Sequence, residues 1–324
     1  MIENGDKVPF KFYFGAPSCV PATDFETAGA AIDSKGIAKL LAKPEIKYLA
    51  EMMNWPGVLY QDKEVYAKIQ AAQRAGKPVD GHAPGLKGEK AEKYAAAGIS
   101  TDHECFTKEE ALDKLKAGMK VLIREGSAAK NFEALIPLME EHHEHIMFCS
   151  DDKHPDELLV SHINQLVARA VAKGHNLYHV LRAACINPVA HYGLEVGGLK
   201  EGDSADFIVV ENLTAFQVKE TYIGGKIVWK DGKSLIPSVP ASEPNQFHAY
   251  KVPAKQLAIK KDTGLVKVIV PKDGELITEK AEHSLSTNSH GELLPNLGED
   301  VLKLVVVNRY QEAPPAIAFI RGIG

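Results

Sequence analysis

Short apolar or β-prone runs alternate with amphipathic stretches along the first half of the chain. The runs predict β-strands near residues 10–16, 47–53, 78–82, 99–103, 120–125 and 146–151. The stretches between them carry apolar residues at helical spacing and predict helices over about residues 24–43, 62–76, 88–97, 107–118 and 129–144. Strands that alternate with helices in this way predict parallel βα units.

Two of these helices have clear ends in the sequence. One stretch opens at Asp62 and ends at Gly76, and another opens at Thr107 and ends at Gly118. Aspartate and threonine side chains cap helix N-termini, and glycine commonly follows the last helical turn. The boundaries of these two helices are therefore predicted more sharply than those of the others.

The pattern changes in the second half of the chain. Residues 155–192 predict two helices that break at Gly174, and residues 197–233 predict short strands with Gly-rich and Asp-Gly turns. A Pro/Ser-rich linker, PSVPASEPNQF, follows, and residues 251–324 contain further strand signals that look like the beginning of an α+β domain. The predicted division is a (β/α) part over 1–196, a small β segment over 197–236 and the start of a C-terminal domain over 237–324.

Six βα units leave two α/β architectures open. Six parallel strands suit a doubly wound open sheet as they stand, whereas a (β/α)8 barrel needs two more strands, and nothing downstream resembles them. In a barrel the active site lies at the carboxyl ends of the strands. The residues at the carboxyl ends of the predicted strands are therefore the place to look for an active site.

Composition narrows the function classes. The 324 residues carry a net charge of −5 and contain 45% hydrophobic and 25% charged residues, which is ordinary for a globular protein and gives no case for nucleic-acid binding. The four cysteines are widely spaced without a C-x-x-C motif, which favours a reducing compartment. No signal peptide or membrane span is apparent in the sequence, and we expect a cytoplasmic protein without a membrane partner.

Four residues of metal-ligand type follow predicted strands. They are Glu51 in LAEMMN, His82 in VDGHAPG, His103 in STDHEC and Asp151 in FCSDDKH. One glutamate, two histidines and one aspartate form a ligand set for a divalent metal, and such ligands alone do not choose between manganese, iron and zinc. The sequence therefore predicts a metal site at the strand ends.

The segments around these residues resemble adenine deaminases of the amidohydrolase superfamily. The similar segments, from about residue 8 to about residue 234, are PSCVPATDFETAG, EMMNWPGV, DGHAPGL, GISTDHE, REGSAAKN, CSDDKHP and GGLKEGDSADFIVVENL. The resemblance implies a (β/α)8 barrel with a binuclear centre, typically manganese or iron, at its mouth. It further implies hydrolytic deamination of adenine to hypoxanthine and ammonia, and a homodimer.

The resemblance also implies a role for each ligand. Glu51 would bridge or bind the metals, His82 and His103 would bind the second metal, and Asp151 would bind the first and move the proton. A coordinated metal lowers the pKa of water, so that hydroxide becomes available near neutral pH to attack C6 of the purine. A carboxylate beside that water, such as Asp151, transfers the proton to the ring or to the leaving amine.

Four neighbouring residues are candidates for substrate binding: Glu104, Arg124, Ser127 and Asp152. Each has a structural alternative. Glu104 would orient His103 from behind, Arg124 and Ser127 would hold their loop, and Asp152 would cap the following turn. The sequence leaves these alternatives open.

One departure from the superfamily pattern matters for activity. Amidohydrolases take two metal ligands from an H-x-H motif at the end of their first strand, and this chain has none at a corresponding position. We expect that the chain represents an internal portion of a longer deaminase, or an incomplete gene product, with impaired activity. The alternatives are another amidohydrolase acting on a cyclic amide or aminopurine, and a non-catalytic remnant with a binding or oligomerisation role. An open-sheet binding protein would bind no metal tightly.

Overall fold

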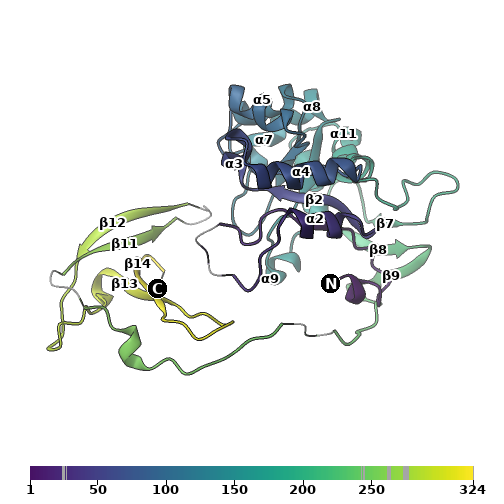
Figure 1. Ribbon diagram of the computed structural model, residues 1–324. Coiled ribbons are helices and arrows are strands. Elements are labelled where there is room, and N and C mark those ends of the chain that lie inside the picture. The colour runs from purple at the N-terminus through teal and green to yellow at the C-terminus, as the bar shows by residue number, and fades with distance from the viewer. Residues whose placement is uncertain are drawn as a thin grey trace. The chain divides into compact units, whose positions relative to one another are not determined.

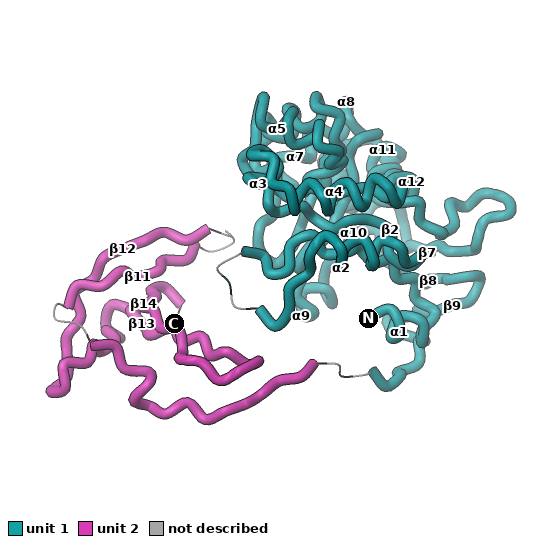
Figure 2. The backbone as a smooth tube through the Cα atoms, viewed as in Figure 1, with its two compact units in different colours: residues 1–242 teal, residues 243–324 magenta. Residues whose placement is uncertain are grey.

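The computed structural model divides the chain into two compact units, Met1–Ser242 and Glu243–Gly324 (Figure 2). The structure describes residues 1–23, 26, 28–241, 243, 245–260, 264–272 and 277–323. The residues predicted to carry the metal site all belong to unit 1.

Unit 1 contains the six predicted strands, and every pairing among them is parallel. They are β1 (Phe14–Pro17), β2 (Ile46–Met52), β3 (Val79–Gly81), β4 (Thr101–Asp102), β5 (Lys120–Arg124) and β6 (Ile146–Cys149), in the orders β1-β2-β3 and β4-β5-β6. The amide of Ser100, just before β4, donates to the carbonyl of Val79 in β3 (2.9 Å) and joins the two sets. The carboxyl ends of all six strands therefore lie along one edge.

Helices connect successive strands and cover one face. The first ones are α2 (Ser34–Leu41), α3 (Trp55–Leu59), α4 (Lys63–Arg74), α5 (Gly88–Ala96) and α6 (Lys108–Lys116). Helices α2 and α4 pack together against β2 (Figure 1). The predicted caps are present, since the Asp62 carboxylate accepts from the Val65 amide (2.9 Å) and the Thr107 hydroxyl accepts from the Glu110 amide (3.2 Å).

Two apolar clusters lie between strands and helices. Leu49, Ile69 and Tyr94 belong to the cluster around β1–β3, and Val121 and Phe132 belong to the one around β4–β6. Helix and sheet thus bury their apolar faces against each other, as layered α/β domains require. This packing fixes the strands whose ends carry the candidate site.

Two of the helices predicted in the first half of the chain differ from the structure. The stretch 24–43 is helical only as α2, which begins after the Asp33 cap, and residues 24, 25 and 27 lie outside the described part of the chain. The stretch 129–144 is divided into α7 (Phe132–Leu135), a 3₁₀ turn (Ile136–Leu138) and α8 (Met139–His142). Pro137 lies in that turn, and proline removes a backbone donor and clashes with the preceding turn of a continuous helix.

The predicted pair of helices over 155–192 is more finely divided. It consists of α9 (Pro155–Leu158), α10 (Ile163–Ala172), α11 (Leu177–Leu181), a π-helical turn (Arg182–Ile186) and α12 (Asn187–Tyr192). The predicted break at Gly174 is present between α10 and α11, with φ of 90° at the glycine. Such a φ favours glycine because a Cβ atom would clash with the backbone.

A small antiparallel sheet completes unit 1. It contains β7 (Phe207–Val210), β8 (Val218–Ile223), β9 (Lys226–Lys230) and β10 (Lys233–Ser234) in the order β10-β9-β8-β7. Asp206, before β7, accepts hydrogen bonds from the amides of Gly197 (3.0 Å) and Gly224 (2.8 Å) and pairs with Lys11 (2.5 Å). The N-terminal segment is therefore tied to this sheet, which is more than 190 residues away in sequence.

Unit 2 is built around one mixed sheet. Its strands are β11 (Leu265–Pro271), β12 (Thr278–Ser284), β13 (Val301–Val306) and β14 (Ala316–Arg321), in the order β12-β11-β14-β13. The helical elements in its described residues are two 3₁₀ turns, Ala254–Leu257 and Leu297–Glu299, so the helical part of the expected α+β domain is not found there. A small apolar cluster that includes Val268, Val301 and Phe319 forms its core.

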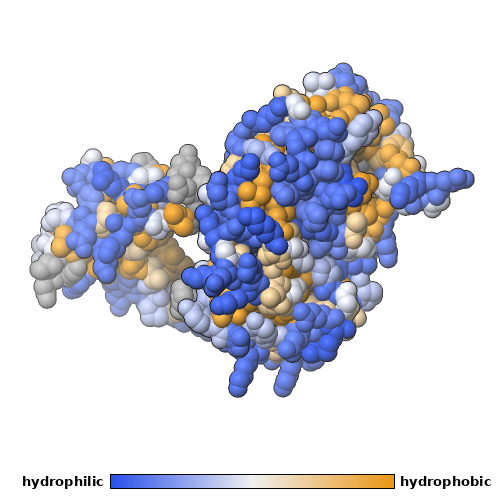
Figure 3. All heavy atoms as spheres, turned by 90° about the horizontal axis from the view of Figure 1, so that it is seen from above, coloured by the Kyte–Doolittle hydropathy of each residue, from blue (hydrophilic) through white to orange (hydrophobic). Residues whose placement is uncertain are grey.

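Apolar patches interrupt the mostly hydrophilic surface seen in Figure 3. Large apolar side chains that are exposed include Phe10, Leu159 and Val160 of unit 1. Among the residues that the structure describes, β1 pairs with β2 alone and β6 pairs with β5 alone, so each has one unpaired edge. No helix in the described ranges is long and apolar enough to cross a membrane.

Candidate metal centre

The strand ends bring the predicted ligands together. Glu51 is the second-to-last residue of β2, His82 and His103 follow β3 and β4 directly, and Asp151 comes two residues after β6. Because the strands are parallel, their carboxyl ends meet along one edge, as in barrel enzymes. The site is thus a direct product of the βα order that the sequence predicted.

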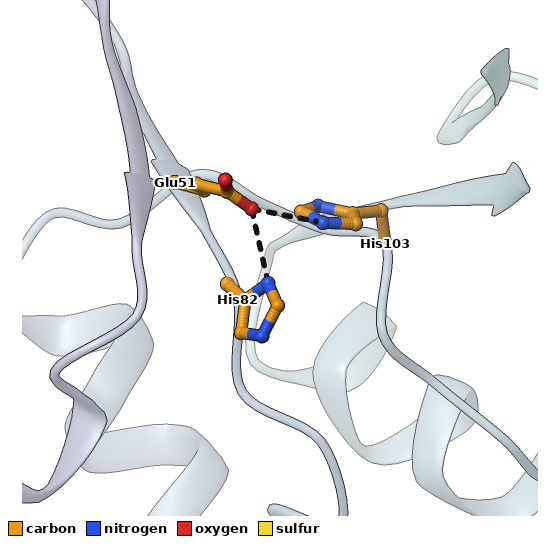
Figure 4. Close-up of side chains that lie close together, drawn as sticks. All are labelled: Glu51, His82 and His103. Atoms are coloured by element: carbon orange, nitrogen blue, oxygen red, sulfur yellow. Dashed lines mark hydrogen bonds and ion pairs between the residues drawn. The ribbon is translucent and has the colours of Figure 1, made fainter. Parts of the chain in front are cut away.

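Glu51 lies between the two histidines (Figure 4). Its Oε2 atom is 3.0 Å from Nδ1 of His82 and 3.2 Å from Nε2 of His103. The imidazole centroids are 5.2 Å apart, and the rings are inclined at 71°. The two nitrogen atoms therefore point toward one position from different directions.

The charges in this group support one another. Hydrogen bonds from His103 and His82 hold the pKa of Glu51 well below its usual range. Burial opposes protonation of His103, but its hydrogen bond to Glu51 and the nearby charges of Asp102 and Asp151 outweigh that effect and raise its pKa. The cluster thus favours an ionised Glu51 carboxylate beside His103.

A second group shares His103. Nε2 of His103 is 3.4 Å from the Glu104 carboxylate and 3.7 Å from Oδ2 of Asp151. The guanidinium of Arg124 pairs with Asp151 at 2.5 Å and also contacts Glu104. Asp151 has a positive φ of 47°, in the left-handed region that only a few residue types, aspartate among them, adopt with modest strain.

Both groups fit a divalent metal. The ligand atoms of Glu51, His82 and His103 lie within 4.8 Å of one another, and so do those of His103, Glu104 and Asp151. Ligands at about 2.1 Å from a tetrahedral ion are roughly 3.4 Å apart, so the side chains need to move little to bind one. Nitrogen and carboxylate donors suit zinc, manganese and iron alike. The structure therefore brings the four predicted ligands together and adds Glu104.

Ser127 and Asp152 take up different positions. The hydroxyl of Ser127 donates to Glu157 (2.7 Å) and accepts from the His154 amide (2.8 Å), so it holds the loop after β6. Asp152 is exposed, and its backbone carbonyl accepts from the Ser127 amide (3.1 Å). In this structure both residues shape the loop beside the cluster.

A cavity of about 490 Å³ opens beside the cluster. Its lining includes Tyr48, Glu51, Asp80, His103, Asp151 and Tyr192. This volume lies within the range of small-molecule sites. Ligand-type side chains therefore face a space that can hold an organic substrate.

Asp80 is a largely buried acid in this cavity that was not among the candidates from the sequence. Its carboxylate accepts hydrogen bonds from the Thr101 hydroxyl (2.8 Å) and from the Tyr192 hydroxyl (3.0 Å). Burial raises the pKa of Asp80 to about 6. The sequence signal was its position two residues before His82, which places both side chains on the same face of a strand.

Comparison with known proteins supports the family resemblance that the sequence motifs indicated. A profile of the amidohydrolase family matches residues 1–228. Curated adenine deaminases are similar over the whole chain: the protein from Salinibacter ruber is 51% identical, that from Sulfurovum sp. is 50% identical and that from Methanosarcina mazei is 46% identical. The resemblance predicted from the sequence motifs is therefore confirmed.

The chain spans about 59% of the length of the first two of these relatives and about 60% of the third. The structure is similar to that of β-aspartyl dipeptidase from Fervidobacterium islandicum AW-1, with a TM-score of 0.51 and 16% identity over 74% of this chain and 70% of that one. At this identity the likeness shows the fold alone. It confirms the predicted α/β class of the barrel type, in preference to a doubly wound sheet. With the family profile covering the parallel strands and the four candidate ligands at their ends, the chain belongs to the amidohydrolase family.

Proposed function

We propose that this chain supplies the metal-binding face of an adenine deaminase, which hydrolyses adenine to hypoxanthine and ammonia. The observation that carries the proposal is the convergence of Glu51, His82, His103 and Asp151 at the ends of neighbouring strands. The similarity to curated adenine deaminases supports adenine over a cyclic amide or another aminopurine.

The proposed centre is binuclear and takes manganese or iron, with zinc as the third choice. Glu51, His82 and His103 would hold one ion, and Asp151 would contribute to the other. A divalent metal bound there would supply an activated water near neutral pH. This assignment follows the converging donor atoms, since Glu51 already faces both imidazoles.

The remaining roles belong to side chains around the cavity. Asp151 would hold and move a proton, because its carboxylate lies beside His103 and opens on the cavity. Glu104 and Arg124 are buried next to it, where they would orient a planar heterocycle or the ligands themselves. Direct substrate contacts by Ser127 and Asp152, and the homodimer, stay predictions.

The test uses the purified chain with Mn²⁺ added after chelation. We expect it to bind the metal and to convert adenine to hypoxanthine. Asp151→Asn should lower kcat by about 10²- to 10⁴-fold, the usual contribution of a positioned acid or base. Asparagine also tolerates the positive φ at this position.

Asp156→Asn is the matched control, because it removes the same charge from an exposed position on α9. It should leave kcat and metal content unchanged. Turnover that is insensitive to Asp151→Asn would contradict the assigned role. Metal binding without any turnover of adenine would instead support the remnant, and turnover of a different cyclic amide would support another amidohydrolase.

A further inference from the structure

Behind the candidate metal centre, buried polar side chains join the ends of successive strands. Tyr94 of α5 links the ends of β2 and β3: its hydroxyl accepts from the His82 amide (3.0 Å) and donates to the carbonyl of Met52 (2.7 Å), the residue after Glu51. The Tyr94 side chain is fully buried. A single hydroxyl thus fixes the distance between two ligand-bearing backbones.

The next link, between β3 and β4, is a buried lysine. Lys114 of α6 is 0% exposed, and its ammonium donates to the carbonyl of Ala83 (2.7 Å) and to Glu110 (3.0 Å) and pairs with Asp102 (3.1 Å). Its three donors therefore face three acceptors. Burial alone would lower the pKa of Lys114, but the charges of Asp102 and Glu110 outweigh it and raise that pKa. The lysine is a cation enclosed by its partners.

The two carboxylates extend the link to the backbone on both sides. Asp102 accepts from the Ala83 amide (2.8 Å), directly after His82, and from the Glu104 amide (2.7 Å), directly after His103. Glu110 accepts from the amides of Gly85 (2.7 Å) and Phe106 (3.1 Å) on the same two loops. We call Lys114, Asp102 and Glu110 the buried triad.

Asn131 provides the following link. Its side-chain amide donates to the carbonyl of His103 (3.2 Å) and its oxygen accepts from the backbone of Arg124 (2.7 Å). The links therefore run from strand to strand along the edge that carries the ligands. The buried triad forms the link between the end of β3, which precedes His82, and the end of β4, which precedes His103.

The position of these contacts distinguishes positioning from general stabilisation. Removing a lysine and two carboxylates from water costs several kcal/mol per ion, and apolar residues of similar volume would often stabilise a core equally well. The acceptors and donors that the triad binds are the peptide groups next to His82 and His103. A metal site needs its donor atoms fixed within a fraction of an ångström, and buried hydrogen-bonded groups supply that rigidity.

We propose that Lys114, together with Asp102 and Glu110, is a positioning residue that fixes the separation of His82 and His103 and thereby sets the metal affinity of the centre. The proposal rests on the proposed function, because it assumes that the two histidines bind a metal. Lys114 does not reach the reacting atoms, so its effect acts through the two loops.

The experiment measures Co²⁺ affinity of the full chain by titration, with the d–d absorption of the bound ion as a signature of its coordination. Lys114→Met keeps an unbranched side chain of nearly the same length and removes its charge and donors. We expect affinity to fall about 10- to 100-fold, as for other partners that orient metal ligands, and the absorption band to change shape. Lys77→Met is the matched control, since Lys77 also donates to two backbone carbonyls, those of Leu41 (2.6 Å) and Lys43 (2.8 Å), but precedes β3 at its opposite end.

Lys77→Met should leave Co²⁺ affinity and spectrum unchanged. A folded Lys114→Met protein with unchanged affinity and spectrum would overturn the proposal. If Lys114→Met does not fold, Glu110→Gln decides, because it keeps the shape of the triad: weaker binding supports positioning, and unchanged binding overturns it. Failure of the unaltered chain to bind Co²⁺ would instead contradict the proposed function itself, so the two failures are distinct.

Discussion

Two lysine–aspartate pairs in unit 1 join different parts of the fold, but they do so in opposite surroundings. Lys114 and Asp102 are 3.1 Å apart behind the metal centre, and both side chains are 0% exposed. Lys11 and Asp206 are 2.5 Å apart beside the small sheet, with side chains 30% and 12% exposed. The shorter pair is thus the one that water reaches.

The difference teaches that burial, rather than distance, decides what such a pair contributes. Charges that water reaches are screened, and exposed pairs contribute at most about 1 kcal/mol. Breaking a buried pair leaves an uncompensated charge in a low-dielectric interior, which is far more costly. The region that carries the proposed metal site should therefore be sensitive to charge changes that the small-sheet junction tolerates.

The largest effect should come from Asp102→Asn. The change leaves Lys114 with one carboxylate partner and weakens the bonds to the Ala83 and Glu104 amides, so we expect a loss of about 3 kcal/mol in the free energy of unfolding. Urea denaturation of the metal-free chain measures it. Asp156→Asn, on the exposed surface of α9, should stay within about 0.5 kcal/mol of the unaltered chain.

An intermediate effect should come from Tyr94→Phe. This change leaves the His82 amide and the Met52 carbonyl without their partner, and unsatisfied buried groups of this kind cost about 1–3 kcal/mol. Tyr66→Phe is the control, since its hydroxyl donates to Val58 at 3.3 Å from a half-buried position. Equal losses for Tyr94→Phe and Tyr66→Phe in the same denaturation assay would show that the buried link between the strand ends stabilises the fold no more than the half-buried hydrogen bond of Tyr66 does.

The smallest effect should come from Asp206→Asn, with a loss of about 1 kcal/mol that shrinks in high salt. Although burial opposes it, hydrogen bonds from Lys11, Gly224 and Gly197 hold the pKa of Asp206 well below its usual range. Because the pKa of Asp206 is lower in the folded state, its ionisation stabilises the folded chain at pH values above the unfolded pKa of about 4. That stabilisation is lost as the pH falls toward the folded pKa.

The difference between Asp206→Asn and the unaltered chain should therefore be constant at neutral pH and diminish below about pH 4. Denaturation at a series of pH values checks this. If Asp206→Asn lowered the free energy of unfolding as much as Asp102→Asn, the contrast between the two pairs would be wrong. Partial exposure to water would then not weaken the pair of Lys11 and Asp206.

The local signals in the sequence were sufficient for the strands and for the well-capped helices. Asp62 and Thr107 cap the helices they were expected to cap, because a side chain and an amide three residues later meet whatever the rest of the fold does. The division of 129–144 at Pro137 was missed, although proline was visible there. The prediction followed the apolar spacing and gave a continuous helix. In the structure Pro137 interrupts that helix, because proline lacks the backbone N–H donor and clashes with the preceding turn.

The sequence by itself determined the βα order, the family resemblance and the four residues at the strand ends. These follow from periodicity and from motifs, which need only neighbouring residues. Only the folded structure determines that Glu51 faces both histidines, that Asp80 lies largely buried in the cavity, and that Lys114 is enclosed rather than solvated. A lysine in an amphipathic helix gives the same local pattern in either case, because burial of its charge depends on carboxylates that only folding brings beside it.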